Sequence, residues 1–399
     1  MSASFRFNRM EFAGSLGDLG TILPLAVGMI MINGMHPTGV FLGFGLFYIL
    51  SGVYFRVTSP AEPMKVISSY ALATGISVGQ IQASCLWIFL LLLILGTSGM
   101  ITSIGKIIRK PVIRGVQLAT GLMLVMQGVK LMAGTSPMQL IQHMAEPNMT
   151  VQAIGPIQLS WLIGGLLGLL ALLLLDNKHL PAAIIVVATG IGAGLLFSAP
   201  ENLERIQLGI FLPALLPYGL PTLDEFTIAF IVLVLPQLPM TVGNAIISNA
   251  DLTGQYFPDT GKRVTYRSLC LSMALANIGS FFIGGIPMCH GAGGLASRYR
   301  FGARTAGSNL IIGGIFLGLV FFLGPNAVAL INLIPFSALG VLLIFAGLQL
   351  ALTLLDLQSR KEMVVPIMIV GITLASNLAA GFVIGILFDT LLRWDKINI

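Results

Sequence analysis

The sequence predicts an all-α polytopic membrane protein, and three observations lead to that prediction. Of the 399 residues, 56% are hydrophobic and only 9% are charged, whereas a soluble domain carries about 25% charged residues. The apolar residues form long continuous runs without the period-two alternation of a membrane β-barrel. The 47 Gly and 20 Pro residues are tolerated inside membrane helices. Soluble enzymes, nucleic-acid-binding proteins and disordered proteins are therefore excluded.

About fourteen apolar runs qualify as transmembrane spans, since a membrane helix needs roughly 20 apolar residues. The third and tenth runs are short and interrupted, whereas the others are ordinary. We place the spans near residues 12–32, 39–56, 62–78, 81–104, 112–132, 157–175, 181–198, 224–247, 266–285, 288–302, 305–323, 327–352, 363–378 and 379–394.

The distribution of basic residues supports this count. With the N-terminus inside and the spans alternating, 18 of the 21 Lys and Arg residues fall on the inner side. Lys65 lies within the third span, and only Lys130 and Arg205 remain outside. Because positively charged loops resist translocation, both termini are expected in the cytoplasm, with the chain embedded in the lipid of a bacterial inner membrane. One basic cluster is interpreted as an inside loop after span ten: Arg298, Arg300 and Arg304.

The two halves of the chain, of seven spans each, correspond to one another. Residues 59–65 and 286–294 both begin with a proline-marked break and continue as a short helix. Spans five and twelve both carry an early proline, at Pro111 and Pro335. An odd number of spans sends the second half into the membrane from the opposite side, so a seven-plus-seven inverted repeat is predicted.

Paired interruptions in corresponding spans indicate the substrate site of a transporter. A helix that begins inside the membrane exposes backbone N–H groups and the positive end of its dipole, and both suit an anion. The glycines after His290 would allow a small ligand to approach the backbone. We therefore expect the N-termini of broken helices three and ten to face each other with the ligand between them.

Charged and polar residues within the spans are the candidate functional groups. Asp18 either couples transport to protons or holds the helices together. Glu62 and Lys65 are three residues apart on one helical face. They form either a self-neutralising ion pair, or a site in which Lys65 attracts an anion and Glu62 takes the coupled proton.

Neutral polar groups near the interruptions complete the candidate set. His290 is either a hydrogen-bond donor to an anion, a proton-sensitive group or a packed polar histidine. Gln237 and Asn244 follow prolines that interrupt span eight, and they either bind the ligand or cap a kink. The candidate substrate-binding residues are Lys65, Glu62, Gln237, Asn244, Cys289, His290, Gly291, Ala292 and Gly293, and the candidate proton-coupling residues are Asp18 and Glu62. No metal is expected, because no further Cys or His cluster accompanies Cys289 and His290.

At these motifs the chain resembles the molybdate transporter family, relatives of the sulfate permeases. The matching stretches are residues 17–21, 60–65, 236–244, 285–296 and 299–305. The resemblance implies a core domain of spans one to four and eight to eleven, from residues 1–104 and 221–324. It implies a gate domain from residues 105–220 and 325–399, and a tetrahedral dianion, molybdate or sulfate, as the substrate.

The leading prediction is a secondary active transporter of such an oxyanion, coupled to protons and without a cofactor. No Gly-rich Lys-Ser/Thr motif for ATP is present. A homodimer is left open. A nucleobase permease of the same fold is an alternative. It would need carboxylates in spans eight and ten, whereas this chain has Gln237 in span eight and no carboxylate in span ten. An anion channel would dispense with proton coupling, and an enzyme would need a clustered catalytic set, whereas the four histidines are scattered.

Overall fold

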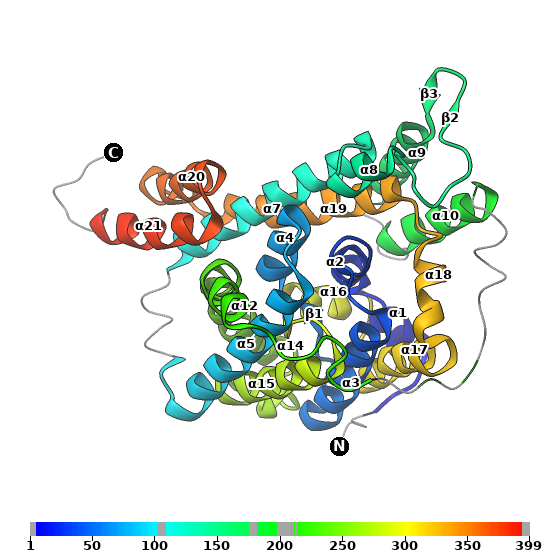
Figure 1. The fold of residues 1–399 in the computed structure, drawn as a ribbon. Helices are drawn as coiled ribbons and strands as arrows, with labels where there is room; N and C mark the ends of the chain where they lie inside the picture. The colour runs from blue at the N-terminus through cyan, green and yellow to red at the C-terminus, as the bar shows by residue number, and fades with distance from the viewer. Residues whose placement is uncertain are drawn as a thin grey trace.

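The computed structural model describes residues 5–101, 109–174, 182–197, 209, 211 and 214–392, and this part of the chain is mostly helical (Figure 1). Within these residues, seven stretches of helix are long and apolar enough to cross a membrane: Pro37–Phe55, Val78–Ser98, Lys110–Ala133, Leu223–Tyr256, Tyr266–Ile283, Gly307–Ile331 and Phe336–Asp356. The pair Arg9–Ser15 and Leu19–Met31, bent by 40°, adds an eighth. The chain is therefore a multi-pass helical membrane protein, and the count of fourteen spans and the inverted repeat stay predictions.

Several predicted segments lie partly outside the described residues. These are the ends of the spans predicted at 81–104, 157–175, 181–198 and 379–394. Lys106, Lys178, Arg205, Arg393 and Lys396, which entered the charge distribution, lie there too.

The helices pack as two groups, which Figure 1 shows one above the other. The first group consists of α1 (Arg9–Ser15), α2 (Leu19–Met31), α3 (Pro37–Phe55), α4 (Lys65–Thr74), α5 (Val78–Ser98), α12 (Leu223–Ile228), η1 (Ala229–Val234), α13 (Leu235–Met240), η2 (Thr241–Ser248), α14 (Asn249–Tyr256), η3 (Gly261–Arg263), α15 (Tyr266–Ile283), α16 (Ala292–Arg300) and α17 (Gly307–Leu323). Within it α5 packs on α15, and α3 packs on both α15 and α17.

The second group is built around a long helix pair. It consists of α7 (Lys110–Ala133), α8 (Pro137–Gln142), α9 (Leu159–Leu174), α10 (Ala182–Phe197), α19 (Phe336–Ala351), η5 (Leu352–Asp356), α20 (Arg360–Ala375) and α21 (Leu378–Leu391). The elements η4 (Gly324–Asn326) and α18 (Ala327–Ile331) connect α17 to α19, and the strands β2 (Ala153–Ile154) and β3 (Ile157–Gln158) form a short hairpin before α9. The two groups meet where α4 touches α7 and where α2 touches α10 and α19.

Glycine pairs bring α7 and α19 into backbone contact. A Cβ at Gly121 would lie 2.5 Å from the carbonyl oxygen of Gly347, and one at Gly128 would lie 2.4 Å from that of Gly340. The order of the partners reverses along the two helices, so the pair is antiparallel. Small residues of this kind allow membrane helices to pack closely where hydrophobic burial gives no driving force.

The structure corrects two predicted boundaries. Residues 327–352 are not one span, because Asn332 to Pro335 separate α18 from α19 and Pro335 supplies the N-cap of α19. Pro236 and Pro239 do not interrupt span eight, since the helix continues from Leu223 to Tyr256. The π-helical segments η1 and η2 flank the prolines, and their wider turns accommodate two rings and two missing N–H donors.

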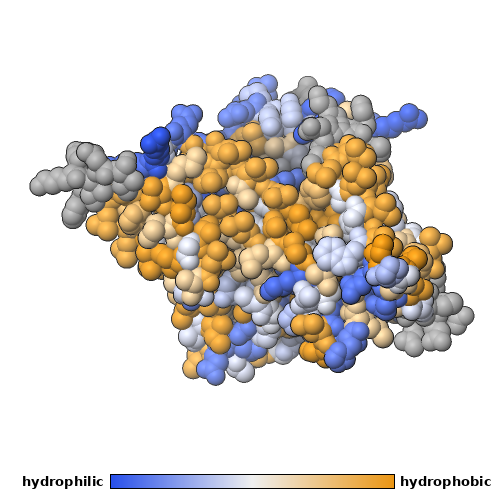
Figure 2. Space-filling view, turned by 90° about the horizontal axis from the view of Figure 1, so that it is seen from above, coloured by the Kyte–Doolittle hydropathy of each residue, from blue (hydrophilic) through white to orange (hydrophobic). Residues whose placement is uncertain are grey.

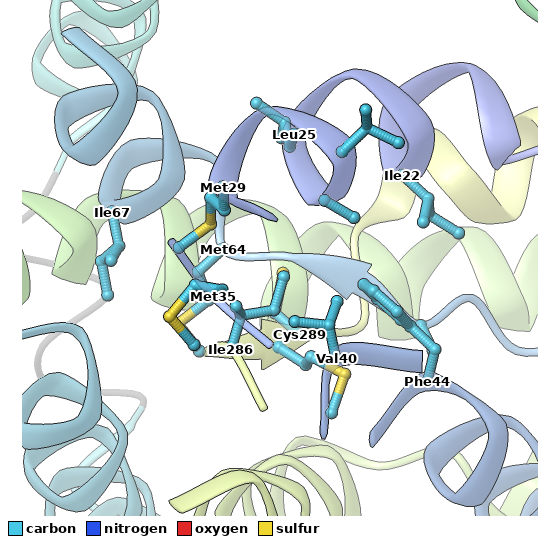
Figure 3. Close-up of a cluster of buried hydrophobic side chains, with 14 of the residues drawn as sticks. Ile22, Leu25, Met29, Met35, Val40, Phe44, Met64, Ile67, Ile286 and Cys289 are labelled. Carbon is cyan, nitrogen blue, oxygen red and sulfur yellow. The ribbon is translucent and has the colours of Figure 1, made fainter. Parts of the chain in front are cut away.

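Buried apolar side chains surround two short strands inside the first group. β1 (Glu62–Pro63) pairs antiparallel with β4 (Met288–Cys289). In Figure 3, Met29, Met35 and Met64 lie beside Ile286 and Cys289, and all five are buried. Flexible methionine side chains fill irregular spaces, so this packing fixes the strands without demanding a regular sheet.

The outer surface is suited to lipid. Figure 2 shows a broad hydrophobic band on one face, with hydrophilic residues mainly near its margins. Leu166, Leu169 and Leu173 of α9 are among the exposed large apolar side chains. An apolar surface of this extent is typical of contact with a membrane.

Candidate functional site

The starts of α4 and α16 lie next to each other in the first group. Each helix follows one strand of the β1–β4 pair, in which Glu62 lies opposite Cys289 and Pro63 opposite Met288. The backbone N–H of Met64, the N-cap of α4, donates to the carbonyl of Pro287 at 2.9 Å. Two segments more than 200 residues apart in sequence thereby bring two helix N-termini together.

A cavity of about 460 Å³ lies between the two helix groups beside these helix starts. The first group lines it with Lys65, Asn244 and Gly293, and the second group lines it with Gln117 and Thr353. Seven of the sequence candidates are not among the lining residues: Asp18, Glu62, Gln237, Cys289, His290, Gly291 and Ala292. The candidates therefore fall into two sets, those that line the cavity and those that do not.

The carboxylate of Glu62 occupies the space against the first turn of α16. Glu62 is fully buried, and one carboxylate oxygen lies 3.2 Å from the Nζ of Lys65. A Cβ at Gly291 would lie 1.8 Å from Oε2 of Glu62, and one at Gly294 would lie 2.7 Å from Oε1. These two glycines therefore make room for a side chain of the protein itself, whereas Gly293 faces the cavity.

Glu62 and Lys65 form their ion pair in a different way from the one predicted. They do not share a helical face, because Glu62 belongs to β1 and α4 begins only at Lys65. The pair is close because the chain turns into the helix between the two residues. Beyond Lys65, the one donor side chain beside the Glu62 carboxylate among the described residues is that of Thr21.

Gln237 closes the N-terminal end of α4. Its Oε1 accepts hydrogen bonds from the backbone N–H groups of Val66 at 3.0 Å and Ile67 at 3.3 Å, and its Nε2 donates to Thr241. The expectation that both helix starts offer unpaired N–H groups is therefore wrong for these two amides of α4. The side chain of Gln237, from α13, thus accepts from N–H groups that were expected to bind the ligand.

His290 is packed inside the first group. Its Nδ1 lies 2.7 Å from the carbonyl of Pro60, which can only accept, so Nδ1 carries the proton and Nε2 accepts from Ser272 at 3.0 Å. The rings of Phe47 and Phe55 lie 4.5 and 5.5 Å from the imidazole. This is the environment of the packed polar histidine among the alternatives. Within the described ranges, no group of three or more His, Cys, Asp or Glu side chains is placed to hold a metal ion.

Asp18 belongs to a second buried ion pair, which the sequence did not indicate. Its Oδ1 lies 3.2 Å from Nη1 of Arg298, and its Oδ2 accepts from the hydroxyl of Tyr48 at 2.6 Å. Arg298 also donates to Thr58 at 2.9 Å and to Asn309 at 2.9 Å. The pair joins the bend between α1 and α2 to α16, and it does not line the cavity.

The interpretation of Arg298 as part of an inside loop is wrong. Arg298 lies within α16 and its side chain is fully buried, whereas Arg300 at the end of the helix is exposed. A buried guanidinium requires acceptors for its five donors, and α16 places Arg298 among such acceptors. The opposite charge at Asp18, also within a predicted span, was the available signal for this partnership.

Comparisons with known proteins agree on one family. A family model described as a molybdate transporter of the MFS superfamily matches residues 10–124 and 229–350. Molybdate transporter 2 of Arabidopsis thaliana is 28% identical over 418 residues, covering 96% of this chain and 87% of that protein. Molybdate transporter 1 of Chlamydomonas reinhardtii is 28% identical over 469 residues, covering 94% of this chain and 90% of that protein.

Solved structures show which fold this is. The transmembrane domain of the cyanobacterial bicarbonate transporter BicA aligns with a TM-score of 0.63 at 16% identity, covering 97% of both chains. The structure of SLC26A9 aligns with a TM-score of 0.65 at 13% identity, covering 96% of this chain and 64% of that chain. At these identities the likeness shows the fold alone.

Proposed function

Because the chain belongs to the molybdate transporter family, we propose that it is a proton-coupled secondary active transporter of a tetrahedral oxyanion, molybdate or sulfate. Its relatives are transporters and not enzymes. The observation that carries the proposal is the cavity between the two helix groups, which places Lys65 beside the first turn of α16. A cation and a helix N-terminus at one cavity wall suit a small dianion.

The substrate site is proposed to include three residues of the first group. Lys65 supplies a positive charge, Asn244 a neutral amide, and Gly293 an open approach to the backbone of α16, and all three line the cavity. Gly293 is exposed to the cavity, and a Cβ there would be 3.7 Å from Nζ of Lys65. Gln237, Cys289, His290, Gly291 and Ala292 are proposed to shape this wall from behind.

Glu62 is proposed to carry the coupled proton. While Glu62 is ionised, it neutralises Lys65 across 3.2 Å. Protonation removes that negative charge and leaves the Lys65 ammonium available to the dianion, so proton and substrate bind together. Asp18, Cys289 and Tyr48 are the other titratable groups close to Glu62, and Asp18 is itself paired with Arg298. This environment favours Glu62 over Asp18 as the coupling residue.

Transport is proposed to proceed by movement of the first helix group, as a core domain, against the second group, as a gate domain. The cavity lies between them, and Arg300, an exposed residue, lines it. The charge distribution of the sequence predicts that Arg300 is cytoplasmic, which supports the proposal that the cavity opens toward the cytoplasm. Both termini are proposed to be cytoplasmic in the same orientation.

Uptake into proteoliposomes tests the proposal. An inward proton gradient is expected to drive accumulation of radiolabelled molybdate, and unlabelled tungstate and sulfate are expected to compete. Glu62→Gln imitates the protonated acid, so it should retain anion exchange but lose accumulation driven by the gradient. Uptake that does not change with the proton gradient would exclude the coupling role of Glu62. Conductance without accumulation favours a channel, and uracil uptake without molybdate uptake favours a nucleobase permease.

A further inference from the structure

Gln117 of α7 lies on the wall of the cavity that the second group forms, and no candidate residue was predicted on that wall. It is only 4% exposed, yet it lines the cavity. Its Oε1 accepts a hydrogen bond from Nη1 of Arg114 at 2.7 Å and lies 2.9 Å from the hydroxyl of Thr353, which shares its one proton with the carbonyl of Leu350 at 2.6 Å. Both Arg114 and Thr353 therefore contact the same atom of this amide, and Arg114 is the stronger donor to it.

The chemistry of these partners fixes the orientation of the amide. A guanidinium can only donate, so the oxygen of Gln117, and not the nitrogen, must face Arg114. Arg114 is itself held by Asp356, whose Oδ1 accepts from Nε at 2.9 Å. The Nε2 atom of Gln117 points away from these donors, and it has no hydrogen-bond acceptor in the described part of the chain.

We propose that Gln117 is a substrate-contacting residue supplied by the second helix group, which donates its amide N–H groups to an oxygen of the oxyanion. Together with Lys65 on the opposite wall, it gives the cavity hydrogen-bond donors on both sides. An oxyanion, which offers only acceptors, fits such a site better than a nucleobase, which needs donors and acceptors on the protein. The inference rests on the proposed anion transport.

A neutral donor on this wall has a specific use in a transporter. Lys65 and Gln117 belong to groups that are proposed to move relative to each other, so the substrate contacts both only while the cavity has its present form. A second lysine in place of Gln117 would bind a dianion more tightly and so slow its release. An amide adds a hydrogen bond without adding charge. A substrate that passes through a membrane protein must bind favourably and yet weakly enough to dissociate.

The test is direct binding of radiolabelled molybdate to the full-length chain in detergent, with melting temperature measured in parallel. Gln117→Ala is expected to raise Kd about 10-fold to 100-fold, the effect of losing a hydrogen bond to a charged group. Gln349→Ala is the matched control, because Gln349 lines the same wall but receives no such pair of donors. Its Kd should stay within about twofold of the wild type, since removing such a surface side chain changes little.

A second variant keeps the proposal testable if Gln117→Ala does not fold. Gln117→Glu still accepts from Arg114 and Thr353 but has no N–H group, so it should fold and bind molybdate more weakly still. Thr353→Val removes the hydroxyl that lies beside Oε1 of Gln117 and leaves Arg114 to orient the amide, so a smaller rise in Kd is expected. Unchanged binding in folded Gln117→Ala or Gln117→Glu, or an equal loss in Gln349→Ala, overturns the inference alone. A wild-type protein that binds neither molybdate nor sulfate overturns the proposed function.

Discussion

Two buried acid–base pairs lie in the first helix group, and they differ in how completely their charges are satisfied. Asp18 with Arg298 and Glu62 with Lys65 are both separated by 3.2 Å. The first pair has a full set of further hydrogen bonds, from Tyr48 to the acid and from Arg298 to neighbouring acceptors. The second pair has little beyond its own contact.

The two pairs also differ in their access to the cavity. Both side chains of the Asp18–Arg298 pair are fully buried, whereas the side chain of Lys65 is 12% exposed and lines the cavity. A buried charge with every partner in place resists change, because any rearrangement would leave groups unsatisfied. A buried charge with one partner can exchange that partner for a proton or a ligand. The comparison therefore favours a structural role for the Asp18–Arg298 pair and supports the proposed transport role of the Glu62–Lys65 pair.

The largest effect is expected from breaking the Asp18–Arg298 pair. Arg298→Leu would leave Asp18 as an unpaired buried charge, and removing one partner of a buried ion pair destabilises by about 3–5 kcal/mol. Most of the folded protein should be lost, as measured by the monodisperse fraction in detergent. Arg300→Leu, at the exposed end of the same helix, is the control and should fold normally. Equal yields of the two variants would contradict the structural role of Arg298.

Lys65→Ala should instead strongly reduce transport while leaving the protein folded, because Glu62 can take a proton when its partner is removed. The ammonium is the one cationic group that the first group places at the helix starts on the cavity wall, and charged hydrogen bonds to a dianion are worth about 1.5–3 kcal/mol each. Uptake of molybdate at low concentration should therefore fall at least about 10-fold. Lys65→Arg, which keeps the charge, should retain part of the activity. Normal uptake by Lys65→Ala would remove this residue from the site.

The sequence predicted the helical membrane fold and the importance of the two proline-marked segments, because both depend on local composition. The prolines at positions 60, 63 and 287 precede the two places where extended residues lead into a helix. Partners across the fold could not be predicted in this way. Gln117 contacts Thr353, 236 residues away, and Arg298 contacts Asp18, 280 residues away.

The same limit explains why the sequence left the roles of individual residues open. A single sequence shows that Gln237 is polar within an apolar span, but not that its oxygen meets the backbone of α4. It shows that glycines follow His290, but not that the carboxylate of Glu62 fills the space they leave. Residue type predicted that these positions matter, and only the packing of α4, α13 and α16 distinguishes a ligand from a cap.

A pair of glycines in α16 tests that distinction with the same substitution. Gly291→Ala would place a methyl group 1.8 Å from the Glu62 carboxylate, so Glu62 must move and uptake should fall several-fold with a changed pH profile. Gly293→Ala meets Lys65 only at 3.7 Å and leaves Glu62 in place, so it should lower uptake by narrowing the approach to α16 but keep the pH profile of the wild type. The measurement is initial uptake rate against external pH in proteoliposomes. Matching pH profiles in both variants would show that the position of Glu62 does not control coupling.

The smallest effect is expected from removing one hydrogen bond to the Asp18–Arg298 pair. Tyr48→Phe removes the hydroxyl that donates to Asp18 at 2.6 Å but leaves the contact with Arg298 in place. The lost hydrogen bond to a charged group should destabilise by about 1.5–3 kcal/mol, less than Arg298→Leu, and lower the melting temperature accordingly. Tyr54→Phe, which deletes the same atom from an exposed ring, is the control and should melt like the wild type. Uptake rate and its pH dependence should be unchanged in both variants, because Asp18 does not line the cavity. A pH profile shifted by Tyr48→Phe alone would instead place Asp18 in the proton path and remove the contrast between the two pairs.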